Sequence, residues 1–422
     1  MKKDKELGIV AGIHALPDGM SRRTMMQLAA AAGISLAMTP AMIKVAEAAD
    51  VVRGKLGMLG LTPSIDYWAL FQKAFRQVAA DLQLDTAEYF NEMDMGKEVA
   101  QIRGLSAANV KMLNGYVYPD GALPVVAKLC EEQAIHFACV WDAPNWYTPP
   151  DAGDHFVNFF TPNSVNDAYE IAKILIKSIG GEGKIASVRG LVAMTEGLRY
   201  KGLEKAVAEF PGVELIEGPR ADWDRKKARD ATLSLLTAHP DIKGFFPLAD
   251  DMAFGTISVL REKGLKNVKV ASIVGLPEGL TEIAKGENFV ASASALPPYQ
   301  CGYTAVAVFD ALNGWKPMLG ERMQHYESVI STVENAAEVN QRFYGEGEKP
   351  FDWLKMSRTL NPETWDPQNR ITALEPEVFW ADVTEGKEKL NPVYKGAKEA
   401  GEFDKVNKLY ADHYKTGPNK KA

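Results

Sequence analysis

The chain has 422 residues, of which 46% are hydrophobic and 24% are charged, as in an ordinary globular protein with room for two domains. Its formal charge of -7 argues against nucleic-acid binding, which requires a basic surface. Only three cysteines are present. Cys130 and Cys139 could pair, because a predicted helix end and the following strand can come close, but spacing alone leaves this open.

The amino terminus predicts an export signal. Ser21-Arg22-Arg23-Thr24-Met25-Met26 is a twin-arginine pattern, and an Ala-rich apolar run follows it to about Met42. The run ends at Ala46-Glu47-Ala48, which has the small-x-small form of a cleavage site. We therefore expect residues 1–48 to be a twin-arginine signal peptide, and the mature chain to be released into a periplasm or at the outer surface. Nothing in the mature region reaches the length of a membrane span.

The mature chain opens on a strand, a tight loop and a helix. Leu56 to Leu61 is a short apolar run, Thr62-Pro63-Ser64 breaks it, and an apolar stripe at helical spacing continues to Leu82. The same alternation then repeats. Strands are predicted at 85–90, 112–117 and 137–141, and helices at 96–108 and 124–133. Alternating strands and helices indicate a parallel sheet that is covered on both faces.

A second series of similar elements follows a crossing near Phe160 to Asn163. Strands are predicted at 184–188, 213–216, 243–247, 268–273 and 289–293, with helices at 164–179, 196–210, 224–238, 251–263 and 278–285. A helix at 299–313 and one last strand from His325 to Thr332 complete the pattern. Two such βα halves predict an α/β protein of two lobes with a ligand cleft between them.

Residues 344–422 lose this alternation and are polar, yet they contain three tryptophans. A disordered tail would be poor in aromatic residues. We expect this carboxyl-terminal extension to pack against the body, with residues 414–422 loose.

Candidate binding residues follow the predicted strands, because ligands of open α/β sheets lie at the carboxyl ends of the strands. Aromatic faces can cover the apolar faces of a sugar, while carboxylates and arginine bind its hydroxyls. The candidates are Tyr67, Trp68, Trp141, Asp142, Trp146, Arg199 and Asp250.

Each candidate also has a structural interpretation. Trp68 lies on an apolar helix stripe and fits a core position equally well. One residue of the Asp250-Asp251 pair is expected to cap the following helix, and Arg199 fits a solvated surface as well as a cleft. Asp222-Trp223-Asp224 is interpreted mainly as a helix cap with a packing tryptophan.

No phosphate loop, GxGxxG turn, HExxH or CxxC motif is present, and the six histidines are scattered. We therefore expect no catalytic residues, no metal and no cofactor.

Several segments together resemble the periplasmic sugar-binding proteins of ribose- and galactose-type ABC importers. Ala221 to Ala228, His239-Pro240-Asp241-Ile242 and Asp250 to Gly255 are similar to the family's aspartate-tryptophan, HPDI and NDxMAxG segments. Arg199 to Leu203 is similar to its RxxGF segment, and Val274 to Gly279 stands where the family has DGxPxG. The resemblance covers about Lys55 to Thr332.

This resemblance implies the type I periplasmic binding protein fold, in which two Rossmann-like lobes with parallel sheets close on ligand about a hinge. The first lobe would comprise 49–161 and 297–324, and the second 162–296 and 325–343. The implied function is capture of a sugar or similar small molecule and its delivery to an ABC transporter permease. Tyr67 and Trp68 would stack on the ligand, and Asp250 matches the motif aspartate. We expect a monomer.

Three positions depart from the family. Ala249, Val274 and Ala295 stand where polar, hydroxyl-binding or hinge residues usually occur. Their loss favours a less hydroxylated, bulkier or partly aromatic ligand, because hydrogen bonds to hydroxyls give such sites their discrimination. A periplasmic sensor component of the same fold is an alternative function, and a periplasmic enzyme is less favoured because no catalytic constellation appears.

Overall fold

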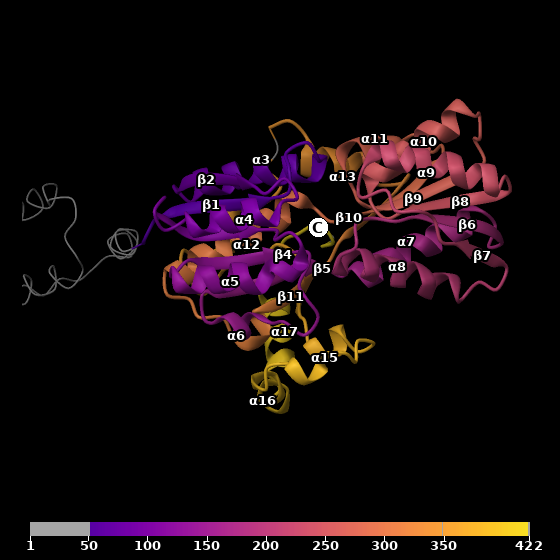
Figure 1. Ribbon diagram of the computed structural model, residues 1–422. Helices are drawn as coiled ribbons and strands as arrows, with labels where there is room; N and C mark the ends of the chain where they lie inside the picture. Colours follow the sequence, from indigo (N-terminus) through magenta and orange to yellow (C-terminus); the bar gives the residue numbers. More distant parts are fainter. Residues whose placement is uncertain (1–50, 348, 421–422) are drawn as a thin grey trace, which may run out of the picture. The chain divides into compact units, whose positions relative to one another are not determined.

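The computed structural model describes residues 51–347 and 349–420, so the predicted signal peptide at 1–48 lies outside the described residues. From Gly54 onward the chain forms one compact unit. Within the described part, no helix has both the length and the apolar character that crossing a bilayer requires. Figure 1 shows two groups of elements, with β5 and β10 running between them.

The first lobe is built on a seven-stranded sheet in the order β13-β11-β5-β4-β3-β1-β2. Neighbouring strands are parallel except for β11 and β13, which are antiparallel. The strands are β1 (Lys55–Gly60), β2 (Asp85–Phe90), β3 (Val110–Gly115), β4 (His136–Val140), β5 (Phe156–Pro162), β11 (Met323–Tyr326) and β13 (Ile371–Ala373).

Helices cover this sheet and supply much of the core. They are α3 (Asp66–Asp81), α4 (Met95–Arg103), η2 (Asp120–Ala122), α5 (Leu123–Glu132), α6 (Pro149–Ala152), α12 (Pro297–Leu312) and η3 (Leu319–Glu321). The predicted apolar stripe of α3 is confirmed, since Trp68, Phe71, Phe75 and Val78 are all buried. α12 is buried along almost its whole length and packs against α3.

The second lobe has a six-stranded sheet in the order β12-β10-β9-β8-β6-β7, with only the β10–β12 pair antiparallel. Its strands are β6 (Gly183–Val188), β7 (Val213–Ile216), β8 (Ile242–Pro247), β9 (Lys269–Val274), β10 (Phe289–Ser294) and β12 (Val329–Thr332). Its helices are α7 (Ser164–Ser178), α8 (Met194–Val207), α9 (Arg225–Ala238), α10 (Asp250–Glu262), α11 (Pro277–Ala284) and α13 (Ala336–Tyr344).

The chain passes between the two sheets three times: from β5 to α7, from β10 to α12, and from β11 to β12. The third passage corrects the prediction of one strand from His325 to Thr332. β11 belongs to the first sheet and β12 to the second, with Glu327 and Ser328 between them. The crossing therefore lies after Tyr326, two residues beyond the predicted boundary. Neither residue between the two strands is a glycine or proline, so the sequence carries no turn signal at the crossing.

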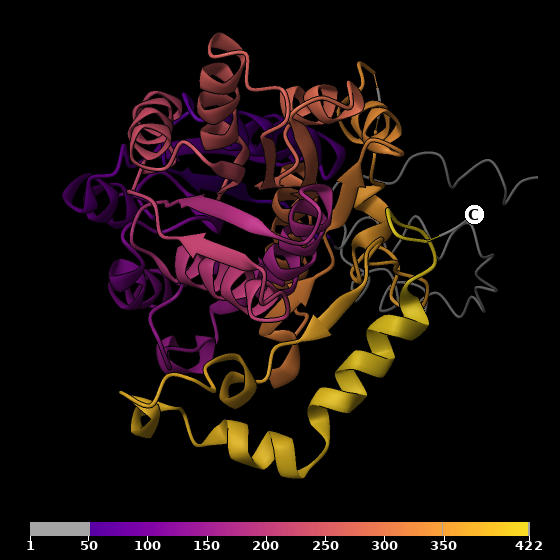
Figure 2. The ribbon, with the colours of Figure 1, turned by 90° about the vertical axis from the view of Figure 1, so that its right-hand side faces the viewer.

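The carboxyl-terminal extension packs against the first lobe. It contains α14 (Trp353–Met356), β13, α15 (Pro376–Phe379), η4 (Lys387–Lys389), α16 (Val393–Glu399) and α17 (Glu402–His413). Figure 2 shows α17 as the long yellow helix. Trp353 lies over Gly302 of α12, where a Cβ atom would come within 2.2 Å of its ring. The hydroxyl groups of Tyr410 and Tyr303 form a hydrogen bond of 2.8 Å.

The prediction of a loose tail from residue 414 is wrong for the described part. The backbone N–H groups of Lys415 and Thr416 donate to Asp366, and Asn419 donates to the Ser328 carbonyl. The three cysteines are free, buried thiols, so Cys130 and Cys139 do not pair.

Candidate ligand-binding site

A cavity of about 90 Å³ lies between the lobes, where carboxyl ends of strands from both sheets meet. Residues that follow β1, β3 and β4 form one wall. Residues that follow β6, β7 and β8, together with Val274 at the end of β9, form the other. The lining residues are Leu61, Ile65, Tyr67, Trp68, Tyr116, Trp141, Asp142, Thr195, Arg199, Trp223, Ala249, Asp251 and Val274. Five of the seven predicted site residues are therefore brought together here.

The wall from the first lobe is aromatic. Tyr67 and Trp68 lie in the first turn of α3, and their ring centroids are 5.0 Å apart. The ring centroids of Tyr67 and Trp141 are 5.4 Å apart, in an edge-to-face arrangement. Trp68 also packs against Tyr116, with ring centroids 5.6 Å apart. The Tyr67 hydroxyl donates to Gln300 of α12, which fixes the ring. Rings held in this way offer a rigid surface to a flat or ring-shaped solute.

Arg199 of α8 enters the cavity from the second lobe. Its guanidinium carbon lies 5.0 Å from the Trp141 ring centroid and 5.7 Å from that of Trp223. Nη1 donates to the Leu248 carbonyl at 2.7 Å, whereas Nε is buried without a hydrogen-bond partner. Burial lowers the pKa of Arg199, and nearby carboxyl groups oppose that effect. Of the two predicted positions for Arg199, a solvated surface or the cleft, the structure shows the cleft, because the residue is only 3% exposed and lines the cavity.

Asp142 connects the two walls. Its Oδ1 accepts a 2.6 Å hydrogen bond from the backbone N–H of Thr195, in the first turn of α8. The Thr195 hydroxyl donates to the Trp141 carbonyl at 3.2 Å. Burial raises the pKa of Asp142, although the hydrogen bond from Thr195 counteracts the rise. Asp142 therefore joins the lobes in addition to lining the cavity.

Asp250 does not line the cavity. It is fully buried, and its carboxylate accepts bonds from the Ser272 and Ser292 hydroxyls and from the Leu276 N–H at 2.7 Å. Burial raises its pKa to about 6. Its oxygens bond to side chains of β9 and β10 and to the loop after β9, so the side chain positions that loop.

The neighbouring Asp251 lines the cavity instead. Burial raises its pKa to about 7, assisted by the charges of Asp66 and Asp250. The expectation that one of this pair caps α10 is wrong, since the residue at the N-cap is Ala249 and no side chain caps the helix.

Trp146 lies apart from the cavity. It is 2% exposed and packs against Trp380 of the extension, with ring centroids 5.5 Å apart. The sequence gives no sign of this partner, which lies more than 200 residues along the chain. Trp146 is a core residue of the first lobe.

Sequence reasoning missed several lining residues. Trp223 was interpreted as packing, and Tyr116 was placed within a predicted strand, although both follow strand ends. Position after a strand end was the signal that would have found them. Thr195, Asp251 and the apolar Leu61 and Ile65 were also missed. Among the departures from the family pattern, Ala249 and Val274 line the cavity, whereas Ala295 does not.

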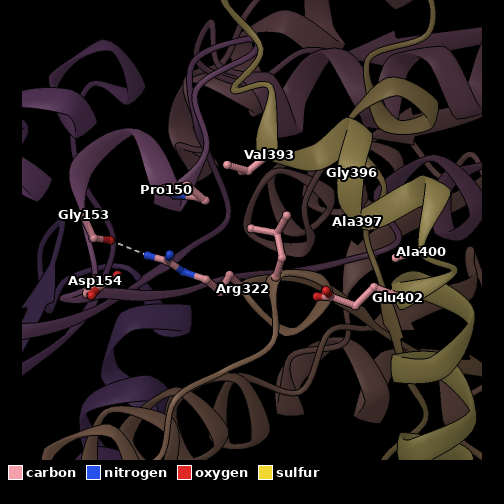
Figure 3. Close-up of a pocket in the computed structure, with 10 residues that line it drawn as sticks. Pro150, Gly153, Asp154, Arg322, Val393, Gly396, Ala397, Ala400 and Glu402 are labelled. Atoms are coloured by element: carbon pink, nitrogen blue, oxygen red, sulfur yellow. Dashed lines mark hydrogen bonds between the residues drawn. The ribbon is translucent and has the colours of Figure 1, made fainter.

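A second hollow of about 500 Å³ lies between the first lobe and the extension. α6 and η3 line it on one side and α16 on the other (Figure 3). Arg322 lies at its base, where Nη2 donates to the Gly153 and Phe156 carbonyls. These bonds tie α6 and β5 to the start of β11, which is a structural role, and the hollow is remote from the strand ends where the two lobes meet. Within the described residues, no group of three or more His, Cys, Asp or Glu side chains is arranged to hold a metal.

The fold and this site define a bilobal α/β binding protein with an interlobe cavity. Residues 56–315, more than half of the chain, match the family model described as a periplasmic binding protein domain. The chain belongs to this family.

Curated relatives share part of the sequence. The ribose import binding protein RbsB of Salmonella typhimurium is 33% identical over 157 residues, which are 37% of this chain and 50% of that protein. The D-allose-binding periplasmic protein of Escherichia coli is 28% identical over 186 residues, 43% of this chain and 59% of that protein. The chain thus spans about half the length of the curated relatives it matches.

Solved structures share the fold. A twin-arginine translocation pathway signal protein from Burkholderia phytofirmans has a TM-score of 0.67 at 24% identity, covering 71% of this chain and 95% of that one. A periplasmic solute-binding protein from Actinobacillus succinogenes, with bound D-allose, has a TM-score of 0.62 at 21% identity. The match covers 68% of this chain and 100% of that one. The prediction of the type I periplasmic binding protein fold is confirmed.

Proposed function

We propose that this chain is an exported solute-binding protein that captures a sugar, polyol or similar small molecule between its lobes and delivers it to an ABC importer. The observation that carries the proposal is the cavity at which carboxyl ends of strands from both lobes converge. Relatives named as ribose import and D-allose-binding proteins support this class of ligand. Binding needs no chemistry, which suits a site of aromatic rings with few free polar groups.

Thermal unfolding tests the proposal. Protein freed of bound solute by unfolding and refolding is incubated with a panel of sugars, polyols and aromatic solutes. A ligand at 100 times its Kd stabilises the folded state by about 2.7 kcal/mol, so a true ligand raises Tm. Native mass spectrometry of gently purified protein then identifies any solute carried from the cell. Unchanged Tm across the whole panel would reject the capture function.

We propose further that export follows the twin-arginine route. The motif Ser21 to Met26 supports this, as does the similar Burkholderia protein named for that pathway. Replacing both Arg22 and Arg23 by lysine should retain the chain in the cytoplasm, as fractionation and immunoblotting would detect. Undiminished export of this double variant would contradict the route while leaving the binding function intact.

The residues of the cavity wall favour one kind of ligand within this class, a solute with few hydroxyl groups. Ala249 and Val274 place apolar groups where the family has hydroxyl-binding residues, and Trp223 adds a further aromatic face. A wall of this kind suits a solute with few hydroxyls and a flat or partly aromatic body.

A further inference from the structure

Several polar groups in the wall of the interlobe cavity already bond to the protein. The Tyr67 hydroxyl donates to Gln300, the Thr195 hydroxyl donates to the Trp141 carbonyl, and Asp142 accepts from the backbone N–H of Thr195. A polyhydroxylated sugar needs several donors and acceptors around its ring. The side chains of Tyr67, Thr195 and Asp142 are therefore less available to the hydroxyls of a solute. Arg199 and Asp251 stand out among the charged groups of the wall.

Arg199 is a buried cation without an ion pair. In the described chain no carboxylate forms a salt bridge with it, and its buried Nε has no hydrogen-bond partner. The acidic groups near it are engaged elsewhere: Asp142 with Thr195, Asp167 with the Ser328 hydroxyl, and Asp250 with two serines. An unpaired buried charge is destabilising, and a guanidinium is well matched to a carboxylate through paired N–H groups.

The surroundings of Arg199 define the rest of the solute. The guanidinium lies close to the Trp141 and Trp223 rings, beside the aromatic wall of Tyr67 and Trp68. Such walls accept a flat or ring-shaped body. Asp251 lines the same cavity and has no hydrogen bond to a protein group among the described residues, which leaves it available to a single donor group of the solute.

We infer that the captured solute is a cyclic carboxylic acid with few hydroxyls, whose carboxylate pairs with Arg199 while its ring contacts the tryptophans. This inference rests on the proposed capture function and names the chemical class of its ligand.

The test compares matched pairs that differ only in the acidic group. Isothermal titration calorimetry of the solute-free protein at pH 8 is carried out with benzoate and benzyl alcohol, cyclohexanecarboxylate and cyclohexylmethanol, and galacturonate and galactose. Ribose, allose and xylitol are titrated alongside. We expect the acid of at least one of the first two pairs to bind, and to bind at least about tenfold more tightly than its alcohol, as a charge-assisted bond predicts.

Two variants test whether Arg199 causes the tighter binding of the acid than of its matched alcohol. R199Q should abolish the difference between acid and alcohol, whereas R229Q should preserve it. Arg229 is a matched control because it pairs with Glu262 on the surface of α9. Should R199Q fail to fold, as circular dichroism would reveal, the titrations of the unmodified protein still decide the matter.

The outcomes separate the two proposals. Tight binding of ribose, allose, xylitol or an alcohol with no gain from the acid would overturn the carboxylate inference and leave the capture function standing. Absence of binding by every solute in these titrations and in the thermal panel would reject both. Preference for the acid that persists in R199Q would refute the role given to Arg199.

Discussion

Two tryptophans show how one residue type serves two purposes in this protein. Trp146 is buried in the first lobe against Trp380, whereas Trp223 is partly exposed and lines the cavity. Both follow strand ends, so position in the sequence does not separate them. Their partners do, because Trp380 covers one of them and Arg199 approaches the other.

This contrast gives a paired prediction. Trp146→Ala should lower the free energy of unfolding by about 3–5 kcal/mol, the usual cost of removing a buried tryptophan, while the affinity of the folded protein is unchanged. Trp223→Ala should weaken binding of the identified ligand by about tenfold or more with a smaller loss of stability. Urea unfolding and calorimetry measure the two quantities. The reverse pattern would show that the cavity is not the binding site.

A pH dependence is expected from Asp251. Burial raises its folded pKa to about 7, above the value of 3.8 for an exposed carboxyl group. The unfolded chain therefore ionises first as pH rises, so this group contributes a loss of stability between about pH 4 and pH 7. Asp251→Asn should remove the loss and stabilise the protein at pH 8 by roughly 1 to 3 kcal/mol relative to the unmodified chain, with little difference at pH 4.

Unfolding by urea at the two pH values measures this effect. Asp85→Asn is the control, because Asp85 is exposed at the start of β2. An equal change in both variants, or a destabilised Asp251→Asn at pH 8, would contradict the burial of this carboxyl group.

At the scale of elements, the first turn of α8 donates its capping hydrogen bond to a side chain of the other lobe. Its N-cap residue, Ala193, has no side chain to accept from the first turn, and Asp142 of the first lobe accepts from Thr195 N–H instead. α9 shows the ordinary arrangement, in which Asp224 of the same lobe accepts from Lys227 N–H at 2.7 Å. The contact between the lobes therefore completes the cap of α8.

Because this hydrogen bond joins the two lobes, Asp142→Ala should destabilise the contact between the lobes more than it destabilises the fold of either lobe. Loss of a cap costs about 0.5–2 kcal/mol, so ligand should dissociate roughly 2- to 30-fold faster. Stopped-flow fluorescence measures the rate, and small-angle scattering measures closure. Asp224→Ala should lower thermal stability to a similar degree with no change in dissociation rate. Equal rates in the two variants would refute a role for Asp142 in closure.

Apolar periodicity predicted most elements of both lobes, because strands buried on both faces are rich in apolar residues, as in β1 and β8. It did not predict α13. It failed at Glu327 and Ser328, where the chain changes sheets with no glycine or proline to signal the crossing. It also gave no sign of β13, a strand of three residues. For the site, strand ends predicted Tyr67, Trp68, Trp141 and Asp142. The pairing of Asp142 with Thr195 depends on tertiary contacts between segments more than 50 residues apart.

At the scale of the whole molecule, the extension completes the first lobe. α12 is buried, and part of its cover comes from Trp353 and Tyr410 of the extension. Arg358 adds a 2.8 Å ion pair to Glu321 and lies 3.7 Å from the Trp365 ring centroid. The extension is therefore part of the fold of the first lobe.

A chain that ends after Gly345 should accordingly lose the cooperative unfolding of the first lobe. Exposing the apolar surface of α12 removes burial worth about 25 cal/mol per Å², a large share of the marginal stability of a domain. Differential scanning calorimetry should show a lowered or split transition. An unchanged Tm for the shortened chain would show that the extension is dispensable.

The antiparallel strand β13 also determines how the first sheet ends. It pairs with β11 for three residues, and the outward N–H of Ala373 donates to the Asn407 side chain of α17 at 2.7 Å. An open sheet edge is a template on which another extended chain can add. Here that edge is short and overlaid by a helix, so neighbouring copies find no row of free backbone groups to zip onto. The extension thereby protects this edge of the first sheet from edge-to-edge pairing with another copy.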